Sequence, residues 1–141
     1  MLKIGGYINI IIAIAHIVGL LWADKMFEVT GIAEGMALAA QNIHPLYPYF
    51  ITVVVAIFFF IFGLYGLSAD GKFRKLPFMK PAIFLIAGIY LVRGIGELLF
   101  DMEMQQANQF LEVTYSLISV FIGLLFLIGG LKKWKLKRND R

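Results

Sequence analysis

The sequence predicts an all-α integral membrane protein built as a four-helix bundle. Its composition is the first observation, since 60% of the 141 residues are hydrophobic, only 16% are charged and the mean hydropathy is +0.82. A soluble domain of this size leaves much of its surface in water and could not cover so much apolar surface. The second observation is a set of four apolar runs of 19 to 22 residues, and a helix needs about 20 to cross the hydrocarbon core. These runs cover residues 4–23, 49–67, 81–100 and 110–131.

The distribution of basic residues predicts how the chain crosses the membrane. Eleven of the 13 lysines and arginines lie close to the N-terminus, in the loop 68–80 or in the tail 132–141. The other two connections, 24–48 and 101–109, carry five acidic residues and a single lysine. Basic residues concentrate on the cytoplasmic side of membrane proteins. We therefore expect both termini in the cytoplasm and the whole chain, residues 1–141, to form a single membrane domain.

The first span is followed by a segment with a different pattern. The span begins after Lys3 and ends near Trp22, a residue type that is enriched at membrane interfaces. In the segment 24–41, apolar residues recur at helical spacing and polar residues occupy the other faces. We expect an amphipathic helix there, lying at the outer interface over the mouth of the bundle. Gly31 and Gly35 weaken that helix.

Proline and glycine residues mark the limits of the remaining spans. Tyr47-Pro48 ends the preceding segment and turns the chain into the second span, which carries no charge. Pro81 begins the third span, where its missing N–H donor is not needed. The fourth span ends at Gly129-Gly130, directly before the basic tail 132–141.

The third span holds two charged residues. Arg93 and Glu97 are four positions apart and therefore share one face of a helix. An ionisable group at the centre of a bilayer costs about 2.5–3.5 kcal/mol on insertion scales, so such groups usually face a protein interior and mark a site. The structural alternative is that the two side chains only neutralise each other inside the bundle.

Polar residues of three spans are predicted at similar depths in the membrane. A helix rises about 1.5 Å per residue, and His16 lies six residues before Trp22 while Arg93 lies seven before Phe100, so both are about 9–10 Å below the outer boundary. The sequence therefore predicts a two-layer polar cluster in the outer half of the bundle. Its members are His16, Tyr90, Arg93 and Tyr115 in the deeper layer, and Glu97 and Glu112 nearer the outside.

We expect this cluster to bind a small anionic or amphiphilic ligand. Arg93 would hold the anionic group, while Tyr90 and Tyr115 would donate hydrogen bonds. His16 would respond to pH, since histidine is the side chain that changes charge between about pH 5 and 8. Two structural alternatives stay open: His16 hydrogen-bonded to a carbonyl group in the core, and Glu112 solvated near the interface.

A short internal repeat is consistent with two parallel hairpins. The spacing from His16 to Asp24 equals that from Arg93 to Asp101, and a glycine lies three residues after the first member of each pair. Hairpins related by an axis along the membrane normal would bring His16 and Arg93 to equivalent positions.

Part of the chain also resembles a known group of sequences. The stretch from Phe62-Gly-Leu-Tyr-Gly-Leu-Ser68 through Leu76-Pro77 to Ile89-Tyr90-Leu-Val-Arg93-Gly94 resembles a pattern found in small four-span inner-membrane proteins of bacteria. The resemblance covers about a quarter of the chain. It implies a fold and a location, and it implies no activity.

Several kinds of chemistry have little support in the sequence. Because cysteine is absent, disulfides, thiol catalysis and thiolate metal sites are excluded. The sequence contains no zinc-protease, histidine-rich or nucleophile motif, and we expect no metal, no cofactor and no nucleic-acid partner. A membrane enzyme that uses His16, His44, Glu97 and Glu112 is therefore the least favoured role.

Two roles remain besides an enzyme. The first is a ligand-binding protein or accessory subunit whose pocket opens to the outer face. The second is a small-solute or proton-coupled transporter, which needs a polar path to the cytoplasm. The inner halves of the spans offer almost nothing for such a path except Asn9. A homodimer would supply the missing path from a second copy of the chain.

Overall fold

The computed structural model of the protein describes residues 1–103 and 109–139, with side chains described for 1–99, 110 and 113–135. All regular structure in these residues is helical. Four helical segments are long and apolar enough to cross a membrane, which confirms the four predicted spans. The helices are α1 (Leu2–Gly19), α2 (Ala23–Val29), α3 (Ala33–Asn42), α4 (Tyr47–Ala69), α5 (Met79–Glu103) and α6 (Gln109–Asn139), with a 3-10 turn, η1 (Leu20–Trp22), between α1 and α2.

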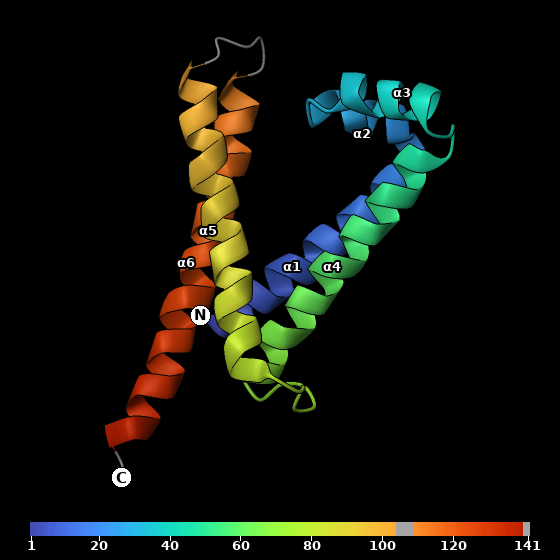
Figure 1. Cartoon of the computed structure of the whole chain (residues 1–141). Helices are drawn as coiled ribbons and strands as arrows, with labels where there is room; N and C mark the ends of the chain where they lie inside the picture. Colours follow the sequence, from blue (N-terminus) through green and yellow to red (C-terminus); the bar gives the residue numbers. More distant parts are fainter. Residues whose placement is uncertain (104–108, 140–141) are drawn as a thin grey trace.

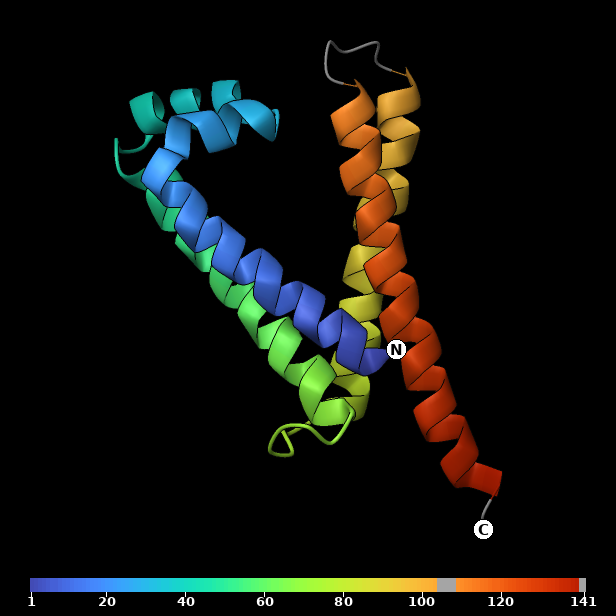
Figure 2. The ribbon, with the colours of Figure 1, turned by 180° about the vertical axis from the view of Figure 1, so that it is seen from behind.

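The four long helices pack as two antiparallel hairpins, α1 with α4 and α5 with α6. The hairpins meet at one end and diverge toward the other, so the molecule is V-shaped (Figures 1 and 2). The N-terminus and the loop 70–78 lie at the closed end, which we call the vertex, and α2 and α3 lie at the open end (Figure 1). The arrangement differs from the expected bundle in that the helices come together at one end only.

Glycine residues allow α1 and α4 to approach closely. A Cβ atom added at Gly66 would lie 2.8 Å from the Cα of Gly6 and 2.9 Å from the carbonyl oxygen of Leu2. A Cβ atom at Gly6 would lie 2.9 Å from the carbonyl oxygen of Gly63. These neighbours are backbone atoms that cannot rotate away, so a side chain at either position would force the helices apart. Small residues serve this purpose at many helix interfaces in membranes.

Glycine residues also allow α5 and α6 of the second hairpin to approach closely. A Cβ atom at Gly94 of α5 would lie 2.8 Å from the carbonyl oxygen of Ser116 on α6, and one at Gly123 would lie 2.8 Å from Cγ of Leu91. Here the contacts include side-chain atoms, because a glycine on one helix packs against a branched side chain on the other. Each hairpin is therefore a closely packed unit in its own right.

The two hairpins pack in related registers. Gly66 of α4 packs against Gly6 of α1, and a Cβ atom at Gly130 of α6 would lie 3.1 Å from a side-chain carbon of Ile83 on α5. Ile83 follows Gly6 by 77 positions, the same offset that the sequence repeat has in its first helix. This correspondence is consistent with two hairpins that have the same orientation, each of them made of two antiparallel helices.

The segment expected as one amphipathic helix forms two. Gly31 adopts a positive φ of 75° between α2 and α3. Its N–H donates to the carbonyl oxygen of Glu28 at 3.1 Å, and the N–H of Ile32 donates to that of Phe27 at 3.0 Å. This pair of bonds is the Schellman ending of a helix, in which the left-handed residue is favoured to be glycine. Gly31 therefore ends α2, and α3 folds back beside it.

An apolar core fills the vertex. Side chains from α1, α4, α5 and α6 meet there, and Ile83, Ile122 and Phe126 are almost completely buried. The ammonium group of Lys133 on α6 donates to the carbonyl oxygen of Ala69 at the end of α4. Cations are favourable at this end of a helix because its last carbonyl groups lack helical partners. The core cluster comprises Leu2, Ala69, Ile83, Ile86, Ala87, Tyr90, Ile122 and Phe126.

The glycine contact between α1 and α4 gives a first prediction. Gly66→Ala should lower the melting temperature of the protein in detergent, because overpacking of this kind costs about 1–3 kcal/mol. Gly88→Ala on α5 is the matched control, since nothing lies within 4 Å of a Cβ atom there. It should be neutral or stabilising by up to about 1 kcal/mol, the helix-propensity gain of alanine over glycine. Equal melting temperatures for the two variants would contradict the close approach of the helices.

Candidate functional site

A buried polar pair links the two hairpins near the vertex. Asn9 of α1 is completely buried, and its Nδ2 donates to the carbonyl oxygen of Gly5 at 2.8 Å. Its Oδ1 accepts a hydrogen bond of 2.5 Å from the hydroxyl of Tyr90 on α5, which is itself buried. Each of the two side chains thus makes at least one hydrogen bond, as buried polar groups in a membrane generally do. This hydrogen bond near the vertex therefore joins α1 of one hairpin to α5 of the other.

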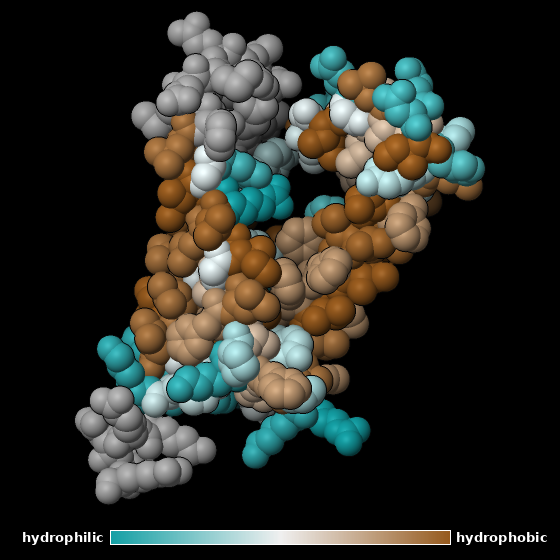
Figure 3. All heavy atoms as spheres, viewed as in Figure 1, coloured by the Kyte–Doolittle hydropathy of each residue, from teal (hydrophilic) through white to brown (hydrophobic). Residues whose placement is uncertain are grey.

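The same helix faces continue into the space between the hairpins. His16 follows Asn9 by seven residues and Glu97 follows Tyr90 by seven, and residues seven apart lie on nearly the same face of a helix. Asn9 and Tyr90 face each other, so His16 and Glu97 project from the facing sides of α1 and α5, about 10 Å farther from the vertex. We call the space between these two walls the cleft. Figure 3 shows it as an opening that a hydrophilic patch borders on the side of α5 and α6.

The α5 wall of the cleft carries an ion pair. Nε of Arg93 lies 2.9 Å from Oε1 of Glu97, which confirms the pairing expected from their spacing. The hydroxyl of Ser116 on α6 donates to Oε2 of the same carboxylate at 3.3 Å. The pair is not enclosed, since the side chains of Arg93 and Glu97 are 53% and 40% exposed. Within the described part of the chain, the two terminal nitrogens of Arg93 have no hydrogen-bond partner.

The α1 wall carries His16. Its Nδ1 lies 2.8 Å from the carbonyl oxygen of Ile12, one turn earlier. Its ring lies 5.0 Å from that of Phe59 on α4, and Phe59 lies 6.4 Å from Tyr90, both between ring centroids. A neutral imidazole that donates from Nδ1 keeps Nε2 as an acceptor. The carbonyl contact is thus the structural alternative considered for His16, and Nε2 has no hydrogen-bond partner among the described residues.

The structure brings the expected site residues together only in part. Tyr90 is tied to Asn9, and Arg93 is paired with Glu97. No hydrogen bond or ion pair within the described residues joins His16 to this pair, because the two hairpins diverge above the vertex. Tyr115 is half-buried on α6. The side chain of Glu112 lies outside the described residues. The same part of the chain shows no cluster of three or more side chains that could hold a metal ion.

Two polar residues of this region were not assigned to the site from the sequence. Asn9 was recognised only as an isolated polar residue in the inner half of its span, and Ser116 was not considered. Each interrupts an apolar run, and each is almost completely buried. The signal that could have found them is the cost of a buried amide or hydroxyl without a partner, which requires an acceptor or donor on a neighbouring helix.

Comparison with known proteins gives no match: no family model, no curated protein and no solved structure corresponds to the chain. Its class rests instead on the helices themselves, four of which have the length and hydropathy of membrane spans. The chain is a multi-pass membrane protein.

The link between the hairpins gives a second prediction. Tyr90→Phe should lower the stability of the protein in detergent by about 0.6 kcal/mol, the average for hydrogen bonds between membrane helices, and by no more than about 1.7 kcal/mol, the largest value. The substitution should cost less in an Asn9→Ala background, because the acceptor is already missing. Tyr7→Phe is the control, since Tyr7 is half-exposed. Thermal unfolding of the wild type, the two single variants, the double variant and the control measures these values, and equal costs of Tyr90→Phe in both backgrounds would rule out the contact.

Proposed function

We propose that the protein is a ligand-binding protein or accessory subunit of the bacterial inner membrane, and that its cleft takes a small anionic or amphiphilic ligand. This proposal rests on the hydrogen bonding and the exposure of the Arg93 side chain. Its Nε is fixed by Glu97, while its terminal nitrogens are without protein partners among the described residues and its side chain is half-exposed. A guanidinium group has a planar set of donors that matches a carboxylate or a phosphate in a bidentate manner.

The carboxylate of Glu97 determines how an anion would be held beside Arg93. Because Glu97 offsets the charge of Arg93, the pair carries no net charge, and an unpaired charge would be costly inside a membrane. An anionic head would therefore be held mainly by directed hydrogen bonds rather than by net charge. His16 would add an acceptor or, when protonated, a second cation on the opposite wall.

The vertex end of the cleft favours an amphiphilic ligand. The rings of Phe59 and Phe62 lie 6.4 and 6.2 Å from that of Tyr90, measured between centroids. This cluster lies below the charged pair, so an apolar tail would pack toward the vertex while the head reached Arg93. Aromatic side chains contribute strongly to such contacts because each buries a large apolar area.

The vertex also bears on the alternative of a transporter. Its core contains Ile83, Ile122 and Phe126 from α5 and α6, all almost completely buried. A transported solute would have to pass this apolar core, and the charged groups of the described cleft end above it. We therefore favour binding over transport for a single copy of the chain.

The charge distribution supports a definite orientation. The vertex carries the basic loop 70–78 and the start of the basic tail, whereas α2 and α3 at the open end carry Asp24, Glu28 and Glu34 with only Lys25. By the positive-inside rule the vertex faces the cytoplasm and the cleft opens outward. In this orientation α2 and α3 lie along the outer interface, each with apolar residues toward the membrane.

Reporter fusions test the orientation. Fusions at Gly71 and after Arg141 should report a cytoplasmic location, and a fusion at Glu34 should report the outside. A cytoplasmic signal at Glu34 would reverse the cleft and overturn its proposed access from the outer face.

Ligand binding tests the role of the cleft. The purified protein in neutral detergent should bind cis-parinaric acid, a fluorescent fatty acid, more tightly than the methyl ester of the same acid. Arg93→Gln should weaken binding of the acid about tenfold, equivalent to about 1.4 kcal/mol. Arg74→Gln removes a cation from the loop at the vertex and should change nothing.

Two outcomes would contradict this role. One is equal affinity of the wild-type protein for acid and ester, a comparison that does not depend on any variant folding. The other is an Arg93→Gln variant with unchanged helical content that binds the acid as the wild-type protein does.

A further inference from the structure

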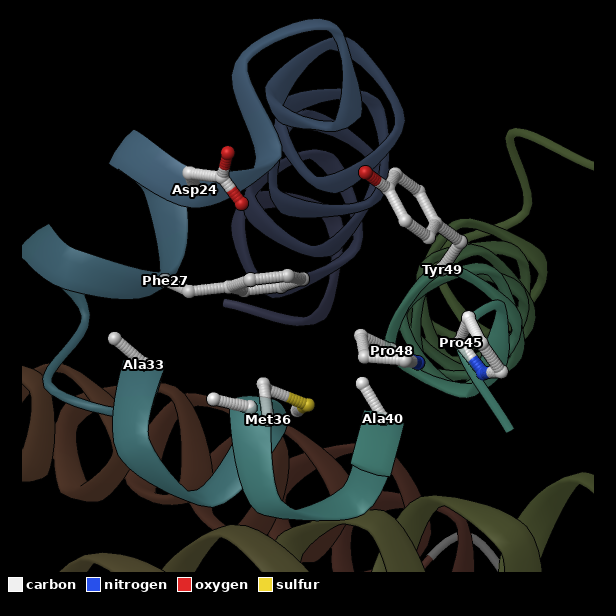
Figure 4. Close-up of a pocket in the computed structure, with 9 residues that line it drawn as sticks. Asp24, Phe27, Ala33, Met36, Ala40, Pro45, Pro48 and Tyr49 are labelled. Carbon is white, nitrogen blue, oxygen red and sulfur yellow. The ribbon is translucent and has the colours of Figure 1, made fainter. Parts of the chain in front are cut away.

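A second pocket lies outside the cleft, between α2, α3 and the start of α4 (Figure 4). Its volume is about 370 Å³. Asp24 and Phe27 project into it from α2, Met36 and several alanines line it from α3, and Pro48 and Tyr49 close it at α4. It is therefore an apolar pocket with one carboxylate at its edge.

The backbone turn at Gly31 creates this pocket. Because α2 ends there and α3 folds back, two short helices lie side by side with a space between them. Phe27 is almost completely buried in that space and forms part of its wall. Pro48 lies in the first turn of α4, where proline is well tolerated, and places Tyr49 at the rim.

The charge of the pocket is negative. Asp24 is the only acidic or basic side chain in its lining. The nearby cation, Lys25, has its ammonium group 2.9 Å from Glu28 and not on Asp24. Within the described residues no basic group forms an ion pair with Asp24. The connection 24–48 as a whole carries three acidic residues and one lysine, so its field also attracts cations.

Two aromatic rings accompany this carboxylate. Figure 4 shows the carboxylate of Asp24 and the hydroxyl of Tyr49 on the same side of the Phe27 ring. A cation near a ring face is attracted by about 0.5–2 kcal/mol, depending on how far it is desolvated. The thioether of Met36 and the ring of Pro48 provide apolar surface for the substituents of such a cation.

We propose that this pocket binds an organic ammonium ion with apolar substituents. Ca²⁺ takes about 6–8 oxygen ligands, and the lining offers one carboxylate among mostly apolar side chains. An anion would be repelled by Asp24. A protonated amine or a quaternary ammonium ion satisfies the carboxylate, the aromatic rings and the apolar walls together. The pocket is separate from Arg93, so this inference does not depend on the proposed function of the cleft.

Calorimetric titration with benzyltrimethylammonium in neutral detergent tests the inference. The wild-type protein should bind the ion, and Asp24→Asn should weaken binding about tenfold, equivalent to about 1.4 kcal/mol. Glu34→Gln is the matched control, because it removes the same charge from an exposed position on α3 outside the pocket. Binding should also weaken with added salt, since Asp24 is exposed and its field is screened.

Comparison of ligands makes the test independent of the variants. Benzyl alcohol and benzoate keep the aromatic ring but lack the cation, and both should bind at least tenfold more weakly. Equal affinities for the three compounds, or equal weakening by Asp24→Asn and Glu34→Gln, would overturn the proposal. Arg93→Gln should leave benzyltrimethylammonium binding unchanged, which separates this result from the cleft experiment.

The source of the ammonium group can be read from a competition experiment. Displacement of benzyltrimethylammonium by dihexanoyl-phosphatidylcholine at submicellar concentration would assign the pocket to lipid headgroups. Absence of displacement would assign it to soluble ammonium ions. Either result supports an ammonium site.

Discussion

The hydrogen bond between the Tyr90 hydroxyl and Asn9 sets the geometry of the whole molecule. It joins two hairpins that also meet through the apolar core at the vertex and through the hydrogen bond from Lys133 to the carbonyl oxygen of Ala69. In a membrane this core gains little from the hydrophobic effect, because lipid tails are as apolar as the side chains they would replace. Close packing and directed polar contacts must therefore fix how the hairpins meet. The walls of the cleft continue the same helix faces, so this contact lies at the base of the space between them.

Much of the fold could be predicted from the sequence because membrane spans have a length and a composition that few other segments share. The pairing of Arg93 with Glu97 followed from helix periodicity alone. The V shape could not be predicted, since an apolar residue that faces lipid looks the same in a sequence as one that faces another helix. Equal depth was therefore taken as proximity, and His16 was expected beside Arg93 although the hairpins separate between them.

The region between the first two spans shows a different limit of sequence reasoning. Gly31 was expected to weaken a helix, and instead it ends one, because its N–H and that of Ile32 can both reach carbonyl groups of the last turn. Asp24 lies in the same region, and it lines a pocket together with Tyr49, which comes from another helix. Such contacts between distant residues arise only when the backbone turns are known.

The V shape also has a mechanical consequence for the bilayer. A protein whose helices converge at one end occupies less area in one leaflet than in the other, so its outline in cross-section is that of a wedge. Lipids adapt to a mismatch with a protein at a modest energetic cost, and mismatch in length is enough to sort proteins among membranes of different thickness. A wedge is best accommodated where the leaflet at its wide end is stretched by curvature.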